Sequence, residues 1–349
     1  MLQRKLLLAL AVVVAAVVLA ALAALQLRPG SRGGSVELVD MAGRRVKVNV
    51  PVKRAVVLSV STLEVIHVIG GDSQVVAVPA EAKLDPLLPA QVRGAPVVGS
   101  RLRLTDWEKA LSLKPDLIVD LDLEAFYDVK GLVDRAASYG IPVLLLREDR
   151  LSDIPATARM LGRVFGRERE AERFASFFEE QVREVRGVAA KIPVGERRSV
   201  VMIQPIFGKL YVVNGNDVLA EAVRLVGADY MANVTLHGYT PVRIPMDREK
   251  IVSSYRDADV IILLTSTVTP LEKVEALKKE MASDPLWRQV KAVREGRVYV
   301  LRADLGQGSY LRWSPRLAVG IWQLGSTIYP EYFPDWRGKA GLLDEFYGH

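Results

Sequence analysis

The chain has 349 residues, half of them hydrophobic, and carries a formal net charge of +6. This length allows two domains with full-sized cores, and this hydrophobic content excludes a disordered or fibrous protein. The positive charge is spread along the chain without the Lys/Arg runs that bind nucleic acid, so we expect no nucleic-acid partner. The sequence contains no cysteine, which excludes disulfides, thiolate metal sites and iron–sulfur clusters.

The N-terminus carries a long apolar segment. Residues 6–27 contain no charged residue and follow Arg4 and Lys5. At about 1.5 Å per residue, a helix of this length spans a bilayer core, whereas a cleavable signal peptide has a shorter apolar stretch. We therefore expect a cytoplasmic N-terminus (1–5), a transmembrane anchor or signal anchor (6–27) and a flexible tether (28–35). Cleavage at Ala21-Leu22-Ala23 is the alternative.

Strands and helices are expected to alternate over residues 36–165, which predicts a doubly wound parallel sheet. A hairpin is expected over 40–51, with Gly43 in its turn. Ser61 or Thr62 is predicted to cap a helix that ends at Gly70. Further strands are expected over 54–60, 75–78, 97–100 and 142–146, and further helices over 131–140 and 152–165.

A long helix is predicted between the two halves of the chain, over residues 166–192. Apolar residues lie on one of its faces, and Pro193 ends it. Its length, roughly 33 Å, is long for a crossover within one sheet. We interpret it as a rigid connector between an N-terminal lobe (36–165) and a C-terminal lobe (193–349). An ordinary surface helix of one larger domain is the alternative.

The second half begins with another set of strands and helices. After Asp284 to Trp287, residues 292–301 are expected to form the end of a helix, a glycine turn and a strand. A final helix is expected from Ser314, with Pro315 in its first turn. Strands are also expected over 199–203, 209–213 and 260–264, and a helix is expected after Asp217 that ends at Gly227.

Two segments about 140 residues apart share one pattern. In each, a Glu-Lys pair opens a short amphipathic helix, and an Asp then starts an all-apolar strand; the segments are 107–122 and 247–264. A repeated unit of helix and buried strand indicates two related lobes, each with a parallel sheet. Two such lobes that meet across a crevice form a ligand clamp.

Several stretches carry a family resemblance, and together they cover nearly the whole chain after the tether. They are Asp40-x-x-Gly43-Arg44-x-Val46, Leu113-Lys114-Pro115-Asp116, Asp284-Pro285-x-Trp287, Ala292-Val293-x-Glu295-Gly296-Arg297, Ser314-Pro315-Arg316, Tyr329-Pro330-Glu331 and Phe346-Tyr347-Gly348. In this order and spacing they resemble the extracytoplasmic solute-binding proteins of ABC importers for ferric siderophores, haem and cobalamin.

The resemblance implies two Rossmann-like lobes with mainly parallel sheets, joined by one long connecting helix. It also implies a monomer without enzymatic activity or cofactor, which delivers a small metal chelate to permease subunits that work with a cytoplasmic ATPase. The chain departs from the common pattern because it lacks a lipid-attachment cysteine after the apolar segment. This departure supports anchoring to the cell membrane by the N-terminal helix, with the binding domain on the extracytoplasmic side.

Glu108 and Glu249 open the two matched helices. Thr105-x-x-Glu108 has the form of a capping box and Asp247 precedes the second helix, so first-turn acids could simply favour the helix dipoles. In the family, however, acids at these two positions, one in each lobe, meet arginines of the permease. The resemblance therefore implies that Glu108 and Glu249 dock the permease.

The ligand is expected between the lobes, outside the carboxyl ends of the strands. Aromatic and arginine side chains in the loops there suit a flat or anionic chelate, although each could be an ordinary surface residue. No two of the three histidines have metal-ligand spacing, so no bare metal site is expected. The candidates for ligand contact are Arg101, Arg103, Tyr127, His237, Tyr239, Arg312 and Trp313.

Two other functions remain open. One is a surface sensor or adhesion domain that keeps the fold without transport. The other is an enzyme similar to an oxidoreductase component, whose clusters would need the cysteines that are absent. No nucleophile elbow or glycine-rich phosphate loop supports catalysis.

Overall fold

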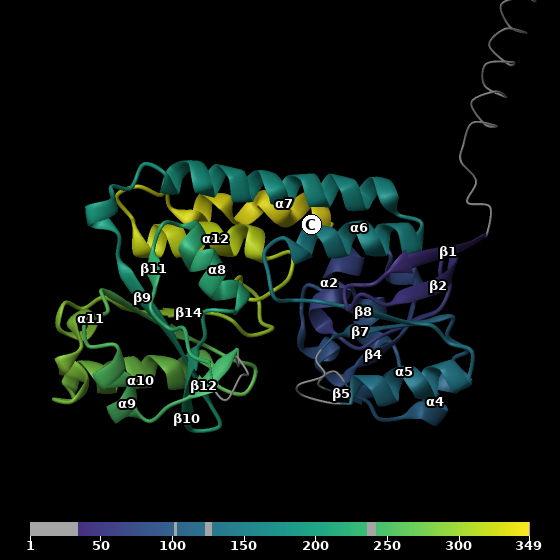
Figure 1. Cartoon of the computed structure of the whole chain (residues 1–349), viewed down its shortest axis with the longest axis horizontal. Coiled ribbons are helices and arrows are strands. Elements are labelled where there is room, and N and C mark those ends of the chain that lie inside the picture. The colour runs from purple at the N-terminus through teal and green to yellow at the C-terminus, as the bar shows by residue number, and fades with distance from the viewer. Residues whose placement is uncertain (1–33, 101–102, 123–127, 236–241, 349) are drawn as a thin grey trace, which may run out of the picture.

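Two α/β lobes lie side by side beneath one long helix (Figure 1). The computed structural model describes residues 34–100, 103–122, 128–235 and 242–348. The predicted anchor over residues 6–27 lies outside these ranges. Within them, no helix combines the length and the apolar character needed to cross a bilayer. The prediction of a two-lobed α/β fold with mainly parallel sheets is confirmed.

The N-terminal lobe contains a six-stranded sheet in the order β6-β5-β4-β3-β7-β8. All neighbours are parallel except β5 and β6. The β1–β2 hairpin packs beside this sheet, and β1 starts within the predicted tether. The strands are β1 (Gly34–Val39), β2 (Arg45–Val50), β3 (Ala55–Val57), β4 (Val75–Pro79), β5 (Val97–Ser100), β6 (Arg103–Leu104), β7 (Leu117–Leu121) and β8 (Val143–Leu146); the helices are α2 (Val60–Val68), α3 (Ala90–Gly94), α4 (Trp107–Ser112), α5 (Val129–Ser138) and α6 (Asp153–Phe165), with short 3-10 turns at Asp72–Gln74 and Ala80–Leu84.

The C-terminal lobe has a sheet in the order β12-β10-β9-β13-β14, with β11 also paired to β9. Strands β9, β13 and β14 are parallel, and β10 is antiparallel to both of its neighbours. The strands are β9 (Ser199–Ile206), β10 (Lys209–Val213), β11 (Asp229–Tyr230), β12 (Arg243–Pro245), β13 (Val260–Leu264) and β14 (Val298–Leu301); the helices are α8 (Val218–Leu225), α9 (Arg248–Ser254), α10 (Leu271–Ser283), α11 (Lys291–Arg294) and α12 (Leu317–Ile328), with 3-10 turns at Val194–Glu196 and Trp287–Gln289.

The repeated pattern in the sequence has the same structural meaning in both lobes. Strands β7 and β13 are fully buried and each lies between two parallel neighbours. The side chain of the Asp before each strand accepts a hydrogen bond from a backbone N–H at the start of the neighbouring strand. Asp116 accepts from Arg54 N at 2.9 Å, and Asp259 accepts from Ser199 N at 2.8 Å. The pattern thus fixes the start of a central strand in each sheet.

Two predicted helix starts were wrong. The N-cap of α2 is Ser59, whose Oγ accepts a hydrogen bond from Thr62 N at 3.2 Å, so neither Ser61 nor Thr62 caps it. Ser61 Oγ instead accepts a hydrogen bond from Arg312 of the other lobe. The last long helix, α12, begins at Leu317, because the Ser314–Arg316 segment forms the turn that precedes it.

The long helix α7 (Glu168–Ala189) lies in the sequence between the last strand of the first sheet and the first strand of the second. Its buried face includes Phe174, Phe178 and Val185, and it packs against α6 of one lobe and α12 of the other. One hydrophobic cluster runs through these helices and includes buried residues of both lobes. The lobes therefore share a core along α7.

The C-terminal segment makes a second connection between the lobes. After α12 it forms a 3-10 segment (Trp336–Leu343) and the short helix α13 (Asp344–Tyr347), which packs on α2 of the N-terminal lobe. The Phe346 ring lies against the rings of Phe174 and Phe177, with centroid distances of 5.4 and 4.9 Å. The resemblance implied a single connection, and the structure has two.

Candidate functional site: the interlobe junction

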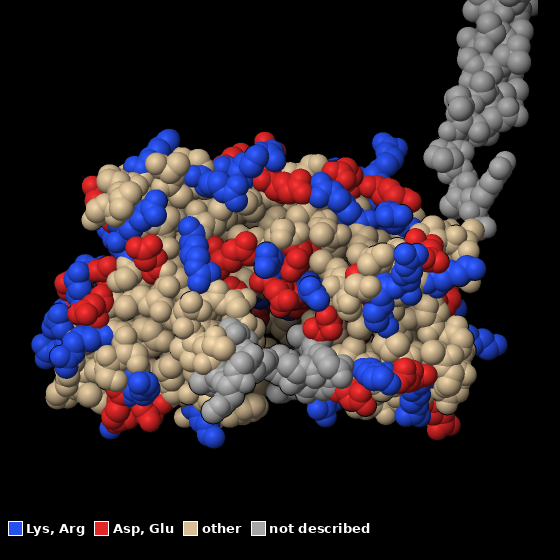
Figure 2. All heavy atoms as spheres, in the orientation of Figure 1, with Lys and Arg blue, Asp and Glu red and all other residues tan. Residues whose placement is uncertain are grey.

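The loops that follow the parallel strands bring the two lobes into contact. After β8, Trp313 Nε1 of the C-terminal lobe donates to Arg150 O at 3.3 Å, and Leu151 N donates to Glu221 Oε2 at 2.8 Å. Figure 2 shows Asp and Glu side chains, together with Lys and Arg, gathered along this junction. The junction is polar because the carboxyl ends of parallel strands carry loops rather than core residues.

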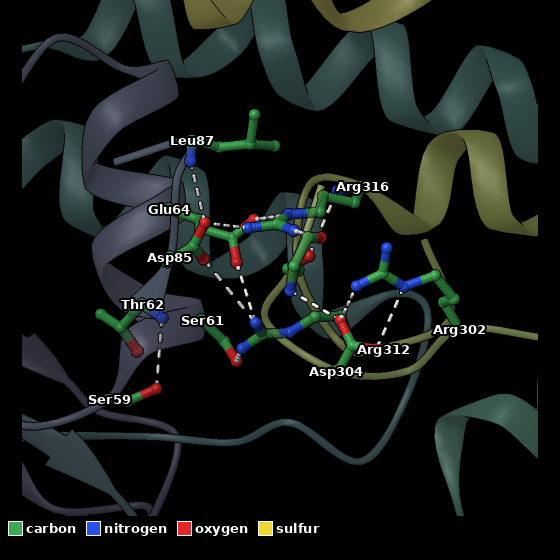
Figure 3. A network of polar contacts seen from close by, with 12 residues as sticks. Ser59, Ser61, Thr62, Glu64, Asp85, Leu87, Arg302, Asp304, Arg312 and Arg316 are labelled. Atoms are coloured by element: carbon green, nitrogen blue, oxygen red, sulfur yellow. Dashed lines mark hydrogen bonds and ion pairs between the residues drawn. The ribbon is translucent and has the colours of Figure 1, made fainter. Parts of the chain in front are cut away.

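A buried ionic network joins the lobes at the base of the junction (Figure 3). Arg316 is fully buried; its Nε lies 2.8 Å from Glu64 Oε2, and its Nη2 contacts Asp85. Glu64 lies on α2 and Asp85 follows the 3-10 turn of the N-terminal lobe, and both carboxylates are fully buried. Tyr347 OH of the C-terminal segment donates to Glu64 Oε2 at 2.9 Å. Three parts of the chain therefore converge on one carboxylate.

Arg312 lies on the outer side of the same network. Its Nη2 donates to Ser61 Oγ at 3.0 Å, and its Nη1 lies 3.3 Å from Glu64 Oε1 and 3.7 Å from Asp85 Oδ2. These ion pairs are longer than the contact between Arg316 Nε and Glu64, and 14% of the Arg312 side chain is exposed. Arg312 is thus the more loosely held of the two arginines.

The two buried carboxylates titrate in opposite directions. Burial favours the neutral form of each, but the charges of Arg316 and Arg312 outweigh burial at Glu64 and lower its pKa. At Asp85, burial and the nearby Glu64 charge dominate and raise the pKa to about 7. The network therefore holds one firmly ionised carboxylate and one that can take up a proton near neutral pH.

Glu148, in the loop after β8, is a second carboxyl group whose pKa is raised. Its carboxylate accepts a hydrogen bond from Ser59 Oγ at 3.0 Å. Burial raises the pKa of Glu148 to about 8, although the Ser59 bond and the Arg312 charge act in the opposite direction. At neutral pH its protonated form can donate a hydrogen bond.

Acidic residues of both lobes also lie at the junction, among them Asp149 and the α8 N-cap Asp217. Burial raises the pKa of Asp149, and the neighbouring charges of Asp153, Asp122 and Asp217 raise it further. Asp217 is the N-cap of α8 in the other lobe and is paired with Arg243. Carboxylates of the two lobes thus lie close enough to act on one another.

The wall formed by the C-terminal lobe is held by its own hydrogen bonds. Gln204 Nε2 donates to Thr265 O at 2.8 Å and Gln204 Oε1 accepts from Arg243 Nε at 2.9 Å. Thr265 Oγ1 donates to Asp304 Oδ2 at 2.7 Å, and Arg302 binds both oxygens of Asp304. Thr265 follows β13, and Arg302 and Asp304 follow β14, while Gln204 lies in β9 and Arg243 starts β12; together they form a preorganised polar surface.

The predicted ligand-contact residues do not all lie in one place. Arg312 and Trp313 lie at the junction, but Trp313 is only 5% exposed. Arg103 is exposed on the edge strand β6, beside a groove of about 450 Å³ near Trp107 and Arg135. The remaining candidates, Arg101, Tyr127, His237 and Tyr239, lie outside the described residues.

The sequence analysis did not assign a role to Glu64, Asp85, Glu148 or Arg316. The single acid in the apolar run Leu63-Glu64-Val65-Ile66 could have indicated a buried ion pair, because a buried carboxylate needs a cationic partner. Arg316 ends the Ser314-Pro315-Arg316 motif, which by itself indicates no function. Among the described residues, no group of three or more His, Asp or Glu side chains is placed to hold a metal ion.

The two docking candidates occupy equivalent positions in the two lobes. Figure 1 shows α4 and α9 at the edge of the lobes farthest from α7. Asp106 caps α4 and Asp247 caps α9, each through its side chain, and Glu108 and Glu249 follow two residues later. Thr105 is therefore not the N-cap of α4, and the predicted capping box was wrong. Both glutamates are exposed, and Glu249 pairs with Arg248 at 2.9 Å.

Comparison with known proteins identifies the family. The model of the periplasmic binding protein family matches residues 56–305. A relative from Bacillus subtilis, the uncharacterized ABC transporter substrate-binding lipoprotein YvrC, is 26% identical over 304 residues, covering 86% of this chain and 87% of that protein. It is named a lipoprotein, whereas this sequence offers no cysteine for a lipid.

Solved structures share the fold. The molybdate-bound periplasmic binding protein MolA of Haemophilus influenzae has a TM-score of 0.71 and 17% identity, over 90% of this chain and 98% of that one. A periplasmic heme binding protein from Pseudomonas aeruginosa has a TM-score of 0.63 and 20% identity, over 80% of this chain and 94% of that one. The prediction that the chain is not an enzyme is confirmed by its family. The chain belongs to the periplasmic binding protein family and is a substrate-binding component of an ABC transporter.

Proposed function

We propose that the protein captures a metal chelate or corrinoid between its lobes and delivers it to an ABC permease from the extracytoplasmic side of the membrane, where residues 6–27 anchor it. The observation that carries this proposal is the pair of exposed acids, one in each lobe, at equivalent helix starts. A permease that contacts both acids senses how the lobes are oriented around the ligand. Such delivery is distinct from a sensor or adhesion role, which needs no paired docking sites.

The charges at the junction favour a neutral chelate over a strongly anionic one. The charge of Asp217 acts on Asp149 of the other lobe, although Asp217 is itself paired with Arg243. Arg312 shares Glu64 and Asp85 with Arg316, so this network offers at most a small positive charge to a ligand. A neutral hydroxamate–iron complex or a corrinoid adds no further repulsion, whereas the propionates of haem do.

A titration tests the ligand class. The full chain is titrated with a ferric hydroxamate, cobalamin and haem while tryptophan emission is followed, with Trp313→Phe as the variant that assigns the signal. We expect quenching of Trp313 by a neutral chelate. Trp287 serves as the internal reference, because it is 1% exposed within the separate hydrophobic core of the C-terminal lobe. Tighter binding of haem than of both neutral chelates would refute the preference.

Charge reversal tests the docking role. In Glu108→Lys/Glu249→Lys we expect transport to fail while ligand affinity is unchanged, because both residues are exposed and far from the junction. The matched control is Glu170→Lys, an exposed acid on α7 at the opposite edge. Normal transport by the double variant contradicts docking through these acids.

A further inference from the structure

A groove lies where the connecting helix meets both lobes, next to the contact between Leu151 and Glu221 at the junction. It has a volume of about 620 Å³ and is lined by residues of α6, α7 and α8. Leu151 and Glu221 line it and are joined by an interlobe hydrogen bond of 2.8 Å. We refer to this feature as the hinge groove. Its volume falls within the usual range for small-molecule sites.

The floor of the hinge groove is apolar. It is formed by Pro155 of α6, Phe178 and Val182 of α7, and Leu225 of α8. Phe178 is 1% exposed, whereas Val182 and Leu225 are half-buried and present part of their surface to the groove. A hydrocarbon chain placed here would remove this surface from water, which is favourable by about 25 cal/mol per Å².

The rim of the hinge groove is cationic. Arg183 and Arg186 stand three residues apart on α7, so they share a face of the helix. Both are exposed, and within the described parts of the chain neither has an acidic partner within ion-pair distance. Arg224 adds a third positive charge from α8.

The two acids of the groove offset only part of the positive charge of this rim. Glu179 is bound by Arg159 at 2.5 Å, and this bond lowers the pKa of Glu179 although its partial burial acts against it. Glu221 accepts a hydrogen bond from the neutral Leu151 N and keeps its charge, so it offsets one of the three arginines Arg183, Arg186 and Arg224. The charge left for a ligand is therefore positive, and it lies next to the apolar floor.

We propose that the hinge groove binds a small amphipathic carboxylate. Its hydrocarbon chain packs on Phe178, Val182 and Leu225, and its carboxylate pairs with Arg183 and Arg186, which offer bidentate donors. Because the lining residues come from both lobes and from α7, the bound molecule contacts both sides of the hinge. Occupancy therefore changes affinity at the interlobe junction to the extent that the two lobe orientations bind the carboxylate differently.

Calorimetric titration of the full chain with decanoate, below its micelle concentration, tests the proposal. We expect saturable binding at one molecule per chain. In Arg183→Gln/Arg186→Gln the affinity should fall roughly tenfold, because two partly exposed ion pairs are lost. The matched control, Arg169→Gln/Lys191→Gln, removes two exposed cations on or next to α7 that do not line the groove and should bind normally.

Two further titrations distinguish the contribution of the arginine charges from that of the groove's shape. Val182→Trp keeps both arginines but fills the groove, and it should abolish binding while the melting temperature shows that the fold is kept. Decyltrimethylammonium has the same chain and the opposite charge, and it should not bind. Absence of saturable decanoate binding, equal binding of the two amphiphiles, or full affinity in the arginine double variant would each overturn the proposal. Each result is independent of transport and of the ligand between the lobes.

Discussion

Arg316 is the side chain at which the two lobes are most firmly joined. It has no exposed surface, and it pairs with two buried carboxylates of the other lobe and with Gly306 O. Removal of one partner from a buried ion pair costs about 3–5 kcal/mol, because the remaining charge loses its compensation. The energetic importance of this residue therefore comes from Glu64 and Asp85, which cannot reach water.

The first prediction concerns this network. Arg316→Met should lower the free energy of unfolding by about 3–5 kcal/mol in urea titrations. The control is Arg337→Met, whose side chain is 74% exposed and whose loss should change stability by less than about 0.5 kcal/mol. Equal effects of the two substitutions would show that the buried network contributes little.

The second prediction concerns pH. The folded state raises the pKa of Glu148 from 4.5 to about 8, so the folded protein holds this proton more tightly than the unfolded chain. The resulting stability is fully present below about pH 4.5 and is lost as the pH rises toward 8. We expect this group to lower the free energy of unfolding by more than about 1 kcal/mol between pH 5 and pH 8.

The comparison for the pH prediction is Glu148→Gln, which keeps the shape of the side chain and removes its titration. The free energy of unfolding should fall less steeply with rising pH in this variant. Part of the pH dependence should remain, because the pKa of Asp85 is also raised in the folded state. Identical slopes for the two proteins would mean that Glu148 is not shifted by burial.

Single residues were harder to predict than elements. The sequence indicated Arg312 and Trp313 at the junction because they follow a strand end, and the structure places both there. It could not indicate that Arg312 and Arg316 pair with Glu64 and Asp85, since these partners are more than 200 residues apart in the chain. Long-range pairing of charges leaves no local pattern.

At the scale of elements, apolar runs were the most reliable signal. Strands β10 and β13 begin and end where the pattern placed them. Strand β13 is fully buried and therefore needs uninterrupted apolar residues, whereas β10 starts with the exposed Lys209. The start of α2 was wrong, because three hydroxyl residues lie within Ser59–Thr62 and the contact between Ser61 and Arg312 decides which of them is the cap. Local propensity cannot separate such neighbours.

The third prediction concerns helix α13. Phe346→Ala should lower the free energy of unfolding by about 3–5 kcal/mol, because the ring packs against Phe174 and Phe177 of α7 and its removal leaves a cavity. Hydrogen exchange at Tyr347 should become faster in the same variant. The control is Val194→Ala, where the side chain is 78% exposed and little change is expected. A stability loss no larger than that of the control contradicts the role given to α13.

At the scale of the whole molecule, the repeated helix–strand unit predicted two lobes, and the length of α7 predicted their separation. The return of the C-terminal segment was not predicted, because a 3-10 segment and one short helix have no clear periodicity. Its contacts depend on Arg173, Glu64 and the phenylalanine rings of α7, which are distant in the sequence.

The fourth prediction concerns closure. Helix α7, the C-terminal segment and the buried network all join the lobes, so ligand binding should rotate them only slightly. Small-angle scattering of the full chain, with and without a chelate found by titration, should show a small decrease in the radius of gyration. A large compaction would contradict a rigid connection.

The network also sets an order of events during synthesis. Glu64 lies 252 residues before Arg316 and 283 before Tyr347. At about 5–20 residues per second, a ribosome needs roughly 13–50 s to add the arginine after the glutamate. During that interval Glu64 and Asp85 have no Arg316 to offset their burial, so the early half of the chain cannot reach its final packing. Its maturation waits for the last residues of the late half.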